Sequence, residues 1–367
     1  MVLWGVILTL VAAVTLGGGY YLSLDLYRLK AFDKLRAKSK ASAHIVALAA
    51  VAACFGALLI FVSVFNAAVI LIHFVLFRLL AALIGFLAGK IRKITPGRGY
   101  LAAVSAVFTV IYLAFGAYNA FHVVRTEYKL TTQKTSSSLR AVLISDTHIG
   151  ALFDGEGLEK HVRTVMDENP DIVFICGDFV DDSTDEENMR AACAALRPLC
   201  EKCRVVYVFG NHDKGYMSAS RRGYSGDDLI NELTQNGVTV LQDGILDIGG
   251  GYCVIGRCDR SDAKRKSIAG LMELAGDGYY TIVLDHQPHD YENEAASGCD
   301  LVLSGHTHGG QLIPINYAGE WIGENDSTYG YEKRSGTEFI VTSGLADWEL
   351  LFKTGCISEY VVIDINR

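Results

Sequence analysis

The sequence predicts an α-helical transmembrane region in the first third of the chain, followed by one α/β domain. Long apolar stretches make up most of residues 1–124, and strand-like and helix-like segments alternate from residue 140 onward. The charge also changes sign. Residues 1–124 hold 11 basic and two acidic residues (near +9), whereas the other 22 basic and 39 acidic residues give near −17. The acidic part argues against a nucleic acid polymer as a tight partner, because phosphate contacts need clustered Lys and Arg. It favours cations.

Four apolar segments are long enough to cross a bilayer. Residues 2–23 carry no charge. The block 43–89 is too long for one helix and is interpreted as two, 43–63 and 67–89, joined by a turn near Asn66. A fourth segment covers 100–122, so we expect four spans, with three as the alternative. Arg78 lies inside the third segment and should face the helix bundle or a neighbouring helix.

The basic loops predict the orientation. The segment from Arg28 to Lys40 carries six basic residues and the segment from Lys90 to Arg98 carries four, so both should be cytoplasmic. With four spans, the N-terminus and the α/β domain lie outside the cytoplasm, whereas with three spans we expect a cytoplasmic domain. Residues 1–23 lack the basic start of a cleavable signal peptide.

The polar, Ser- and Thr-rich residues 125–139 are interpreted as a linker to the domain 140–367. We expect strands at 140–145, 172–176, 204–209, 252–256, 280–284, 300–304, 337–342 and 358–365. Helices are expected at 156–168, 185–199, 227–236 and 263–275. Cys200 and Cys203 form a C-x-x-C that fits a small disulfide, a weak metal motif or buried thiols; without a second C-x-x-C we favour buried thiols.

Metal-binding side chains follow five predicted strands at the point where each strand ends. In LISDTHIG, residues 143–150, Asp146 and His148 come directly after a buried strand. Because the loops beyond the carboxyl ends of strands form the ligand crevice of open α/β sheets, these side chains should converge. The complete series is Asp146, His148, Asp178, Asn211, His212, Asp213, His286, His306 and His308.

Each motif alone has a structural explanation. Asp146 or Asp178 fits a turn, Asn211 fits a helix cap and His286 fits a buried core histidine. Five such strand ends in succession are better explained by one metal site. Carboxylates, imidazoles and one amide, without thiolate, suit Mn, Fe, Zn or Ni rather than a structural zinc or an all-oxygen calcium site.

The ordered series D-x-H, G-D, G-N-H-D, H and G-H-x-H resembles the calcineurin-like metallophosphoesterase superfamily. The resemblance covers residues 140–365. The membrane-anchored N-terminus and the ending SGHTHGGQ make the chain most similar to the bacterial YkuE-type branch. This resemblance implies a four-layer α/β/β/α sandwich with two central mixed sheets.

The resemblance also implies two divalent metal ions, Mn²⁺, Fe²⁺ or Zn²⁺, with Asp178 bridging them. It assigns the first metal to Asp146, His148, Asp178 and His308. It assigns the second metal to Asp178, Asn211, His286 and His306. His212 would stabilise or protonate the leaving-group oxygen, and Asp213 would orient His212 and keep it protonated.

These assignments predict a membrane-bound phosphoesterase. Its substrate would be a phosphate mono-, di- or pyrophosphate ester, lipid-linked, cell-envelope or nucleotide-type, attacked in line by a hydroxide that bridges the metals. One alternative is a cytoplasmic-facing phosphodiesterase of a soluble nucleotide. The other is a non-catalytic membrane sensor or scaffold, against which the complete set of ligands argues.

Two departures bear on the substrate. The branch is expected to carry arginines after the late strand, where this chain has Ser343 and Lys353, so basic groups for phosphate are reduced or replaced. The loop 214–226, with Arg221 and Arg222, fits either a substrate-facing loop or a solvated connection.

Overall fold

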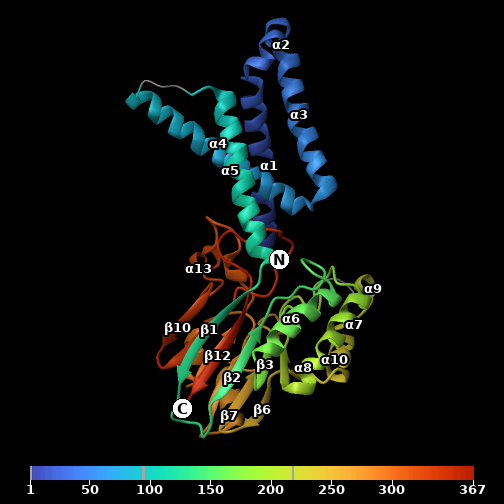
Figure 1. The fold of residues 1–367 in the computed structure, drawn as a ribbon, viewed down its shortest axis with the longest axis vertical. Helices are drawn as coiled ribbons and strands as arrows, with labels where there is room; N and C mark the ends of the chain where they lie inside the picture. Colours follow the sequence, from blue (N-terminus) through green and yellow to red (C-terminus); the bar gives the residue numbers. More distant parts are fainter. Residues whose placement is uncertain (1, 93–95, 217–218) are drawn as a thin grey trace. The chain divides into compact units, whose positions relative to one another are not determined.

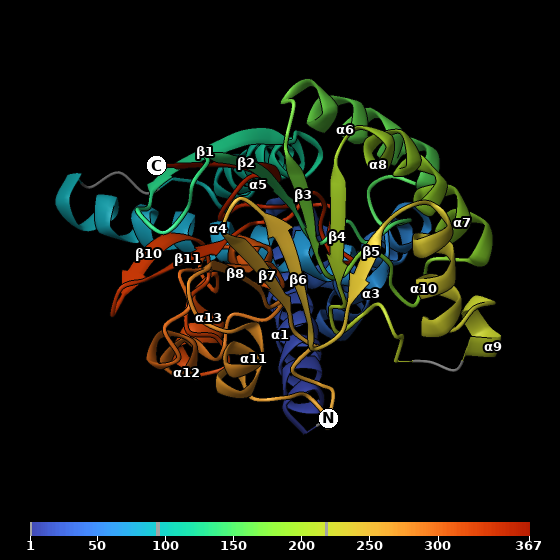
Figure 2. The same ribbon diagram turned by 90° about the horizontal axis from the view of Figure 1, so that it is seen from below.

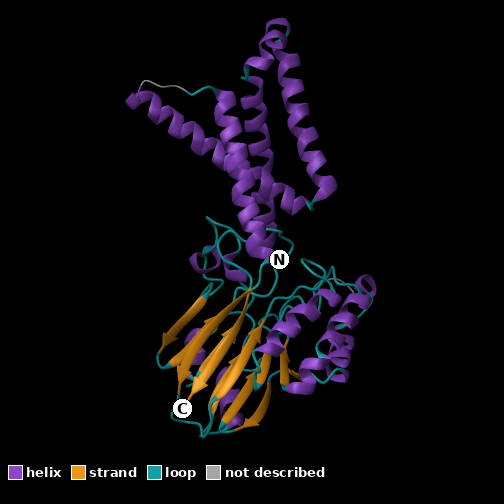
Figure 3. Cartoon of the chain, viewed as in Figure 1, coloured by secondary structure: helices purple, strands orange, loops and turns teal. Residues whose placement is uncertain are grey.

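A computed structural model describes residues 2–92, 96–216 and 219–367, and it divides into two compact units, Met1–Phe115 and Gly116–Arg367. Figure 1 gives the order of the elements and Figure 3 their type. The described strands all belong to the second unit. The division agrees with the predicted change from apolar helices to an α/β domain.

The first unit is helical. It contains α1 (Val2–Tyr27), α2 (Asp33–Lys38), α3 (Lys40–Phe61), α4 (Val64–Arg92) and the larger part of α5 (Arg98–Phe121), with the 3₁₀ turn η1 (Lys30–Phe32). The Ser39 side chain caps α3 by accepting the Ser42 amide, and Ser63 Oγ accepts the Asn66 amide at the start of α4. The second of these caps lies between the second and third predicted spans.

Three helices within the described residues are long and apolar enough to cross a membrane: Lys40–Phe61, Val64–Ile91 and Arg98–Phe121. Helix α1 covers the first predicted span, residues 2–23, but several of its first side chains lie outside the described residues. The number of four spans therefore stays a prediction.

Arg78 faces the interior of the first unit, as its position in an apolar segment predicts. Its Nε and Nη2 atoms donate to the two oxygens of Asp25 at 2.8 and 2.9 Å, and its side chain is 2% exposed. A charge at this depth is costly unless it is paired. The ion pair therefore joins α1 to α4.

Two six-stranded sheets form the centre of the second unit. The first has the order β1 (Val124–Thr131), β12 (Glu359–Asn366), β2 (Leu139–Ile144), β3 (Ile172–Cys176), β4 (Arg204–Val208) and β5 (Thr239–Leu241). The second has the order β10 (Gly330–Arg334), β11 (Thr337–Val341), β9 (Leu301–Ser304), β8 (Tyr280–Leu284), β7 (Tyr252–Gly256) and β6 (Gly244–Gly249). Both contain parallel and antiparallel pairs, so both are mixed.

Helices cover the outer face of each sheet (Figure 2). The first sheet carries α6 (Gly155–Asp167), α7 (Glu186–Ala195), α8 (Arg197–Lys202) and α10 (Gly226–Gln235), and the second carries α11 (Ile268–Ala275) and α12 (Tyr291–Ala296). One buried apolar cluster lies between the sheets, and one lies between each sheet and its helices. The predicted four-layer α/β/β/α sandwich is confirmed.

The predicted linker 125–139 is wrong in its first half, because Val124–Thr131 form β1, which pairs in parallel with β12. Outward-facing Arg125, Glu127 and Lys129 give an edge strand a polar composition, although Thr126, Tyr128 and Leu130 point inward. Strands β5, β6 and β10 were not predicted either. The predicted helix 185–199 is two helices, and Pro198 lies at the start of the second.

Candidate metal centre

The candidate ligands meet because their strands are parallel. Strands β2, β3 and β4 run parallel in one sheet, and β7, β8 and β9 run parallel in the other. Their carboxyl ends therefore point to the same edge of each sheet, where the loops can carry ligands. This arrangement brings residues 146–308 of the sequence to one place.

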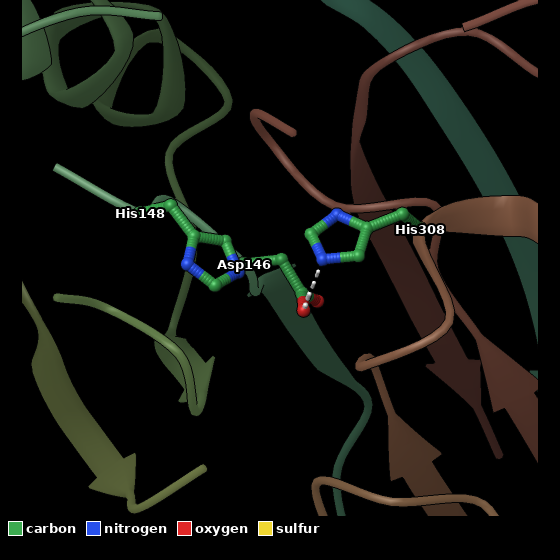
Figure 4. Close-up of side chains that lie close together, drawn as sticks. All are labelled: Asp146, His148 and His308. Atoms are coloured by element: carbon green, nitrogen blue, oxygen red, sulfur yellow. Dashed lines mark ion pairs between the residues drawn. The ribbon is translucent and has the colours of Figure 1, made fainter. Parts of the chain in front are cut away.

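The first ligand set consists of Asp146, His148 and His308 (Figure 4). Their donor atoms all lie within 4.8 Å of one another, and all three side chains are buried. His308 Nε2 lies 3.6 Å from Asp146 Oδ1. Two imidazoles and a carboxylate around one point can hold a divalent transition metal.

The second set consists of Asp178, His286 and His306, whose donor atoms also lie within 4.8 Å of one another. Asp178 Oδ2 is 3.0 Å from His286 Nε2 and 3.7 Å from His148 Nε2, so its carboxylate borders both sets. A carboxylate in this position can bridge two cations.

Asn211 offers a further ligand atom. Its Nδ2 donates to Tyr216 Oη at 2.8 Å, which identifies Oδ1 as the free end of the amide. This oxygen is buried and has no hydrogen-bond partner among the described residues. A buried carbonyl oxygen without a partner is costly, and a metal ion would satisfy it.

Oxygen atoms lie behind three of the imidazoles, on the side away from the ligand sets. His286 Nδ1 lies 2.7 Å from the Cys176 carbonyl, so it donates there and leaves Nε2 for a metal. His148 Nδ1 lies 3.5 Å from Asp181 Oδ2, and His308 Nδ1 lies 3.5 Å from Asp347 Oδ1. Sequence reasoning missed both carboxylates. Asp181 could have been suspected in DFVDD, but nothing near Asp347 in the sequence signals its role.

The backbone at the ligands is strained. Asp146, His148, Asp178, His306 and His308 have φ values of 53°, 38°, 50°, 71° and 49°. Residues other than glycine rarely adopt this left-handed region, and such strain concentrates at functional sites. The surrounding structure must hold these five conformations in place.

Glycines in the motifs allow the close approach of the two sheets. A Cβ atom at Gly177, where φ is +80°, would lie 2.6 Å from His286 Nδ1. A Cβ atom at Gly305 would lie 2.0 Å from Ser145 Oγ and 2.3 Å from Asp146 Oδ2. Gly177 and Gly305, which precede Asp178 and His306, are thus required because there is no room for a side chain.

The protonation states of the site favour the binding of cations. Burial opposes ionisation of Asp178, but His286 holds the pKa of that carboxyl well below its usual range. Burial lowers the pKa of His306 to about 4 and that of His308 well below its usual range, so both rings are neutral and able to bind metal. Asp146, Asp178 and Asp347 are buried, and buried carboxylates need paired cations.

His212 lies beside both ligand sets without belonging to either. Its backbone N–H donates to Asp178 Oδ1 at 2.8 Å, and its ring centroid lies 5.1 Å from that of His148. Tyr216 and Trp348 flank the ring at centroid distances of 5.1 and 5.4 Å. Burial lowers the pKa of His212.

The prediction that Asp213 orients His212 is wrong. Asp213 Oδ1 accepts the Phe179 and Val180 amides at 2.8 and 3.1 Å, and its Oδ2 accepts the Asp178 and Gly210 amides at 2.8 and 2.7 Å. With both oxygens occupied, Asp213 joins the loop after β3 to the loop after β4. It therefore positions the backbone that carries Asp178.

Two of the basic groups considered for substrate binding, Lys353 and Arg222, have structural roles. Lys353 is fully buried, and its Nζ donates to the carbonyls of Ser343 and Ala346. Arg222 is also buried, and it donates to the Asp213 carbonyl at 2.8 Å. Neither side chain is available to bind substrate phosphate. Residues 217–218 of the loop 214–226 lie outside the described residues.

Removal of divalent ions is expected to lower the melting temperature. At about a thousand times its dissociation constant, each bound ion adds ~4 kcal/mol to the folded state. Thermal unfolding with Mn²⁺ and with EDTA measures this difference, and His308→Ala should reduce it. The same melting temperature under both conditions would exclude a metal centre.

Two adjacent candidate metal-ligand sets on a four-layer α/β/β/α sandwich define the class of this domain. Residues 139–310 match the family model for calcineurin-like phosphoesterases. The chain thus contains a calcineurin-like metallophosphoesterase domain, which confirms the resemblance.

Three relatives place this domain among similar proteins. A metallophosphoesterase of Helicobacter pylori is 29% identical over 231 residues, which cover 60% of this chain and 58% of that protein. The metallophosphoesterase YkuE of Bacillus subtilis is 27% identical over 176 residues, which cover 47% and 59%. A transmembrane protein with metallophosphoesterase domain of Danio rerio is 29% identical over 231 residues, which cover 58% and 51%. The matches span little more than half the length of these relatives.

Proposed function

We propose that this protein is a membrane-bound hydrolase of phosphoric ester bonds that uses two divalent metal ions, Mn²⁺, Fe²⁺ or Zn²⁺. The observation that carries the proposal is the pair of largely buried ligand sets, in which the Asp178 carboxylate belongs to one set and borders the other. Hydrolysis of bis-p-nitrophenyl phosphate by the purified chain with Mn²⁺ tests it. A chain that binds two Mn²⁺ ions and hydrolyses no phosphate ester would instead be a sensor or scaffold.

When bound, two such ions supply a water of lowered pKa and neutralise the phosphoryl oxygens. The protein's part is to hold the ligands rigidly. The Cys176 carbonyl orients the His286 ring, and Asp181 and Asp347 lie behind the rings of His148 and His308. Asp213 fixes the loop that carries Asp178. The reacting phosphate would be positioned between ligands from both sheets.

His212 is proposed to stabilise the leaving-group oxygen. Its ring adjoins His148, with Trp348 on another side, and this position would exclude water from the departing oxygen. The lowered pKa of His212, which follows from burial, favours a neutral ring whose N–H donates a hydrogen bond. A leaving group that is unstable as an anion depends most on this hydrogen bond.

His212→Ala is expected to lower kcat/KM for an alkyl phosphate ester by ~10²–10³. The loss for a p-nitrophenyl ester should be smaller, because p-nitrophenolate departs without a proton. Steady-state kinetics on the two esters measure the difference. His161→Ala on α6 is the control and should change neither rate. Equal losses on both esters would contradict the leaving-group role.

We further propose that the domain lies outside the cytoplasm. Helix α5 alone separates the basic segment Lys90–Arg98 from the domain, so a cytoplasmic segment gives an external domain. This reasoning does not depend on whether α1 spans the membrane. If α1 does not span the membrane, the three remaining spans still give an external domain. In that case the expectation that three spans give a cytoplasmic domain does not hold. A reporter fused after Arg367 tests the orientation, and a cytoplasmic signal would reject it.

A further inference from the structure

An exposed apolar surface follows the last two metal ligands in the chain. Between η2 (His308–Gly310) and β10, the ten residues 313–322 present five large apolar side chains to solvent and include the short helix α13 (Ala318–Trp321). Trp321 is 71% exposed and Ile315 is 61% exposed. We call this the 313–322 surface; its members are Ile313, Ile315, Tyr317, Trp321 and Ile322. So dense a group marks a site of interaction.

The 313–322 surface is attached to the segment 352–358. The amides of Thr354 and Gly355 both donate to the Gln311 carbonyl, at 2.8 and 3.0 Å. The Ile313 amide donates to Thr354 Oγ1 at 3.0 Å. The start of the apolar surface is therefore held by three hydrogen bonds within the second unit.

The same segment holds the end of α5, residues 116–121, which also belong to the second unit. The Lys353 amide donates to the Gly116 carbonyl at 2.9 Å, and Asn119 Nδ2 donates to the Lys353 carbonyl at 3.0 Å. Ser358 Oγ donates to the Ala120 carbonyl at 2.9 Å. One short segment thus connects the 313–322 surface to the final turns of an apolar helix.

The final turns of a membrane-spanning α5 would lie at a membrane interface. Helix α5 is 24 residues long and is apolar enough to span a bilayer, and Tyr118 and Phe121 near its end are 56% and 55% exposed. Aromatic side chains concentrate where a span leaves the hydrocarbon core. Tyr317 and Trp321 on the 313–322 surface are side chains of the same kind.

We propose that the 313–322 surface inserts into the interfacial layer of the bilayer and presents the metal centre to phosphate esters carried by membrane lipids. This inference rests on the proposed hydrolase activity and narrows its substrate class. The surface is nearly uncharged, with Glu320 as its one ionisable acid or base apart from Tyr317, which suits a lipid interface better than a charged partner.

The first test asks whether lipid contacts Trp321. The full chain, with Trp4→Phe, is reconstituted in phosphatidylcholine vesicles whose acyl chains are plain or brominated near the headgroup. Brominated lipid should quench about half or more of the Trp321 emission, obtained by subtracting the spectrum of the Trp4→Phe/Trp321→Phe chain. Unchanged Trp321 emission in brominated lipid would overturn the proposal and indicate a protein partner for this surface.

The second test compares two diesters with the same reacting group. Hexadecyl p-nitrophenyl phosphate is embedded in the vesicles, and methyl p-nitrophenyl phosphate is dissolved in water. Trp321→Ser/Ile322→Ser should lower the ratio of kcat/KM for the anchored over the soluble diester about tenfold, because two apolar anchors are lost. The control, Leu274→Ser, removes an apolar side chain on α11 that is 66% exposed and should leave the ratio unchanged.

The two diesters separate the two proposals. If the wild-type chain with Mn²⁺ hydrolyses neither diester, the hydrolase proposal fails, and the substrate class that rests on it fails too. If it hydrolyses both and the double variant leaves the ratio unchanged, the inference about the membrane surface alone is overturned.

Discussion

Asp178→Asn lowers kcat/KM for phosphodiester hydrolysis by about a thousandfold or more, the largest catalytic effect expected in this protein. Asp178 borders both ligand sets, through contacts of 3.0 Å to His286 and 3.7 Å to His148. Asparagine keeps the shape but removes the negative charge and one of the two ligand oxygens. Residue 178 would then lack the charge and the second oxygen with which it holds the two metal ions in place.

The measurement combines steady-state kinetics with metal content. We expect fewer than two Mn²⁺ per chain for Asp178→Asn, together with the loss of rate. Asp277→Asn makes the same chemical change at an exposed loop position and should retain both rate and metal. Undiminished hydrolysis by Asp178→Asn would rule out the two-metal mechanism.

Lys353→Met is expected to produce the largest loss of stability, about 3–5 kcal/mol. The Lys353 ammonium is fully buried, and it donates to the Ser343 carbonyl at 2.6 Å and the Ala346 carbonyl at 2.8 Å. It also offsets the buried charge of Asp347, whose pKa burial raises to about 7. Methionine fills the space but leaves both carbonyls unpaired and Asp347 without a cation.

The segment that Lys353 holds also supports the metal ligands. The Ala346 amide donates to the Asp146 carbonyl at 3.0 Å, and Asp347 lies behind the His308 ring. Lys353→Met should therefore weaken Mn²⁺ binding ~10–100-fold as well. Thermal unfolding and a Mn²⁺ titration measure the two effects.

The control for this variant is Lys160→Met, at an exposed position of α6, which should change stability by no more than about 0.5 kcal/mol. If Lys353→Met unfolds at the temperature of the wild type and binds Mn²⁺ equally well, Lys353 supports neither the fold nor the metal ligands.

Local sequence patterns predicted most of the second unit. Continuous apolar runs such as 172–176 became buried parallel strands, because a strand covered on both faces needs no polar side. The ligands were predictable for the same reason, since each one directly follows such a strand. The exceptions are edge elements: β1 alternates charged and half-buried residues, and its apolar face is recognisable only once β12 is beside it.

Asp213 shows where a local argument fails. Its position next to His212 suggested a contact, but successive residues in a turn point in different directions. The carboxylate instead accepts amides from the loop that begins 35 residues earlier. Adjacency in the sequence is a weak predictor of contact outside helices and strands.

The sequence by itself determined the kinds of ligand and their order along the chain, because these follow from short motifs at strand ends. Only the tertiary structure decided which groups support the ligands. Asp347 is 39 residues from His308, Lys353 lies near the end of the chain, and the 313–322 surface meets the end of α5 through residues 352–358. Such contacts depend on how two sheets and their loops pack together, and no local periodicity encodes that packing.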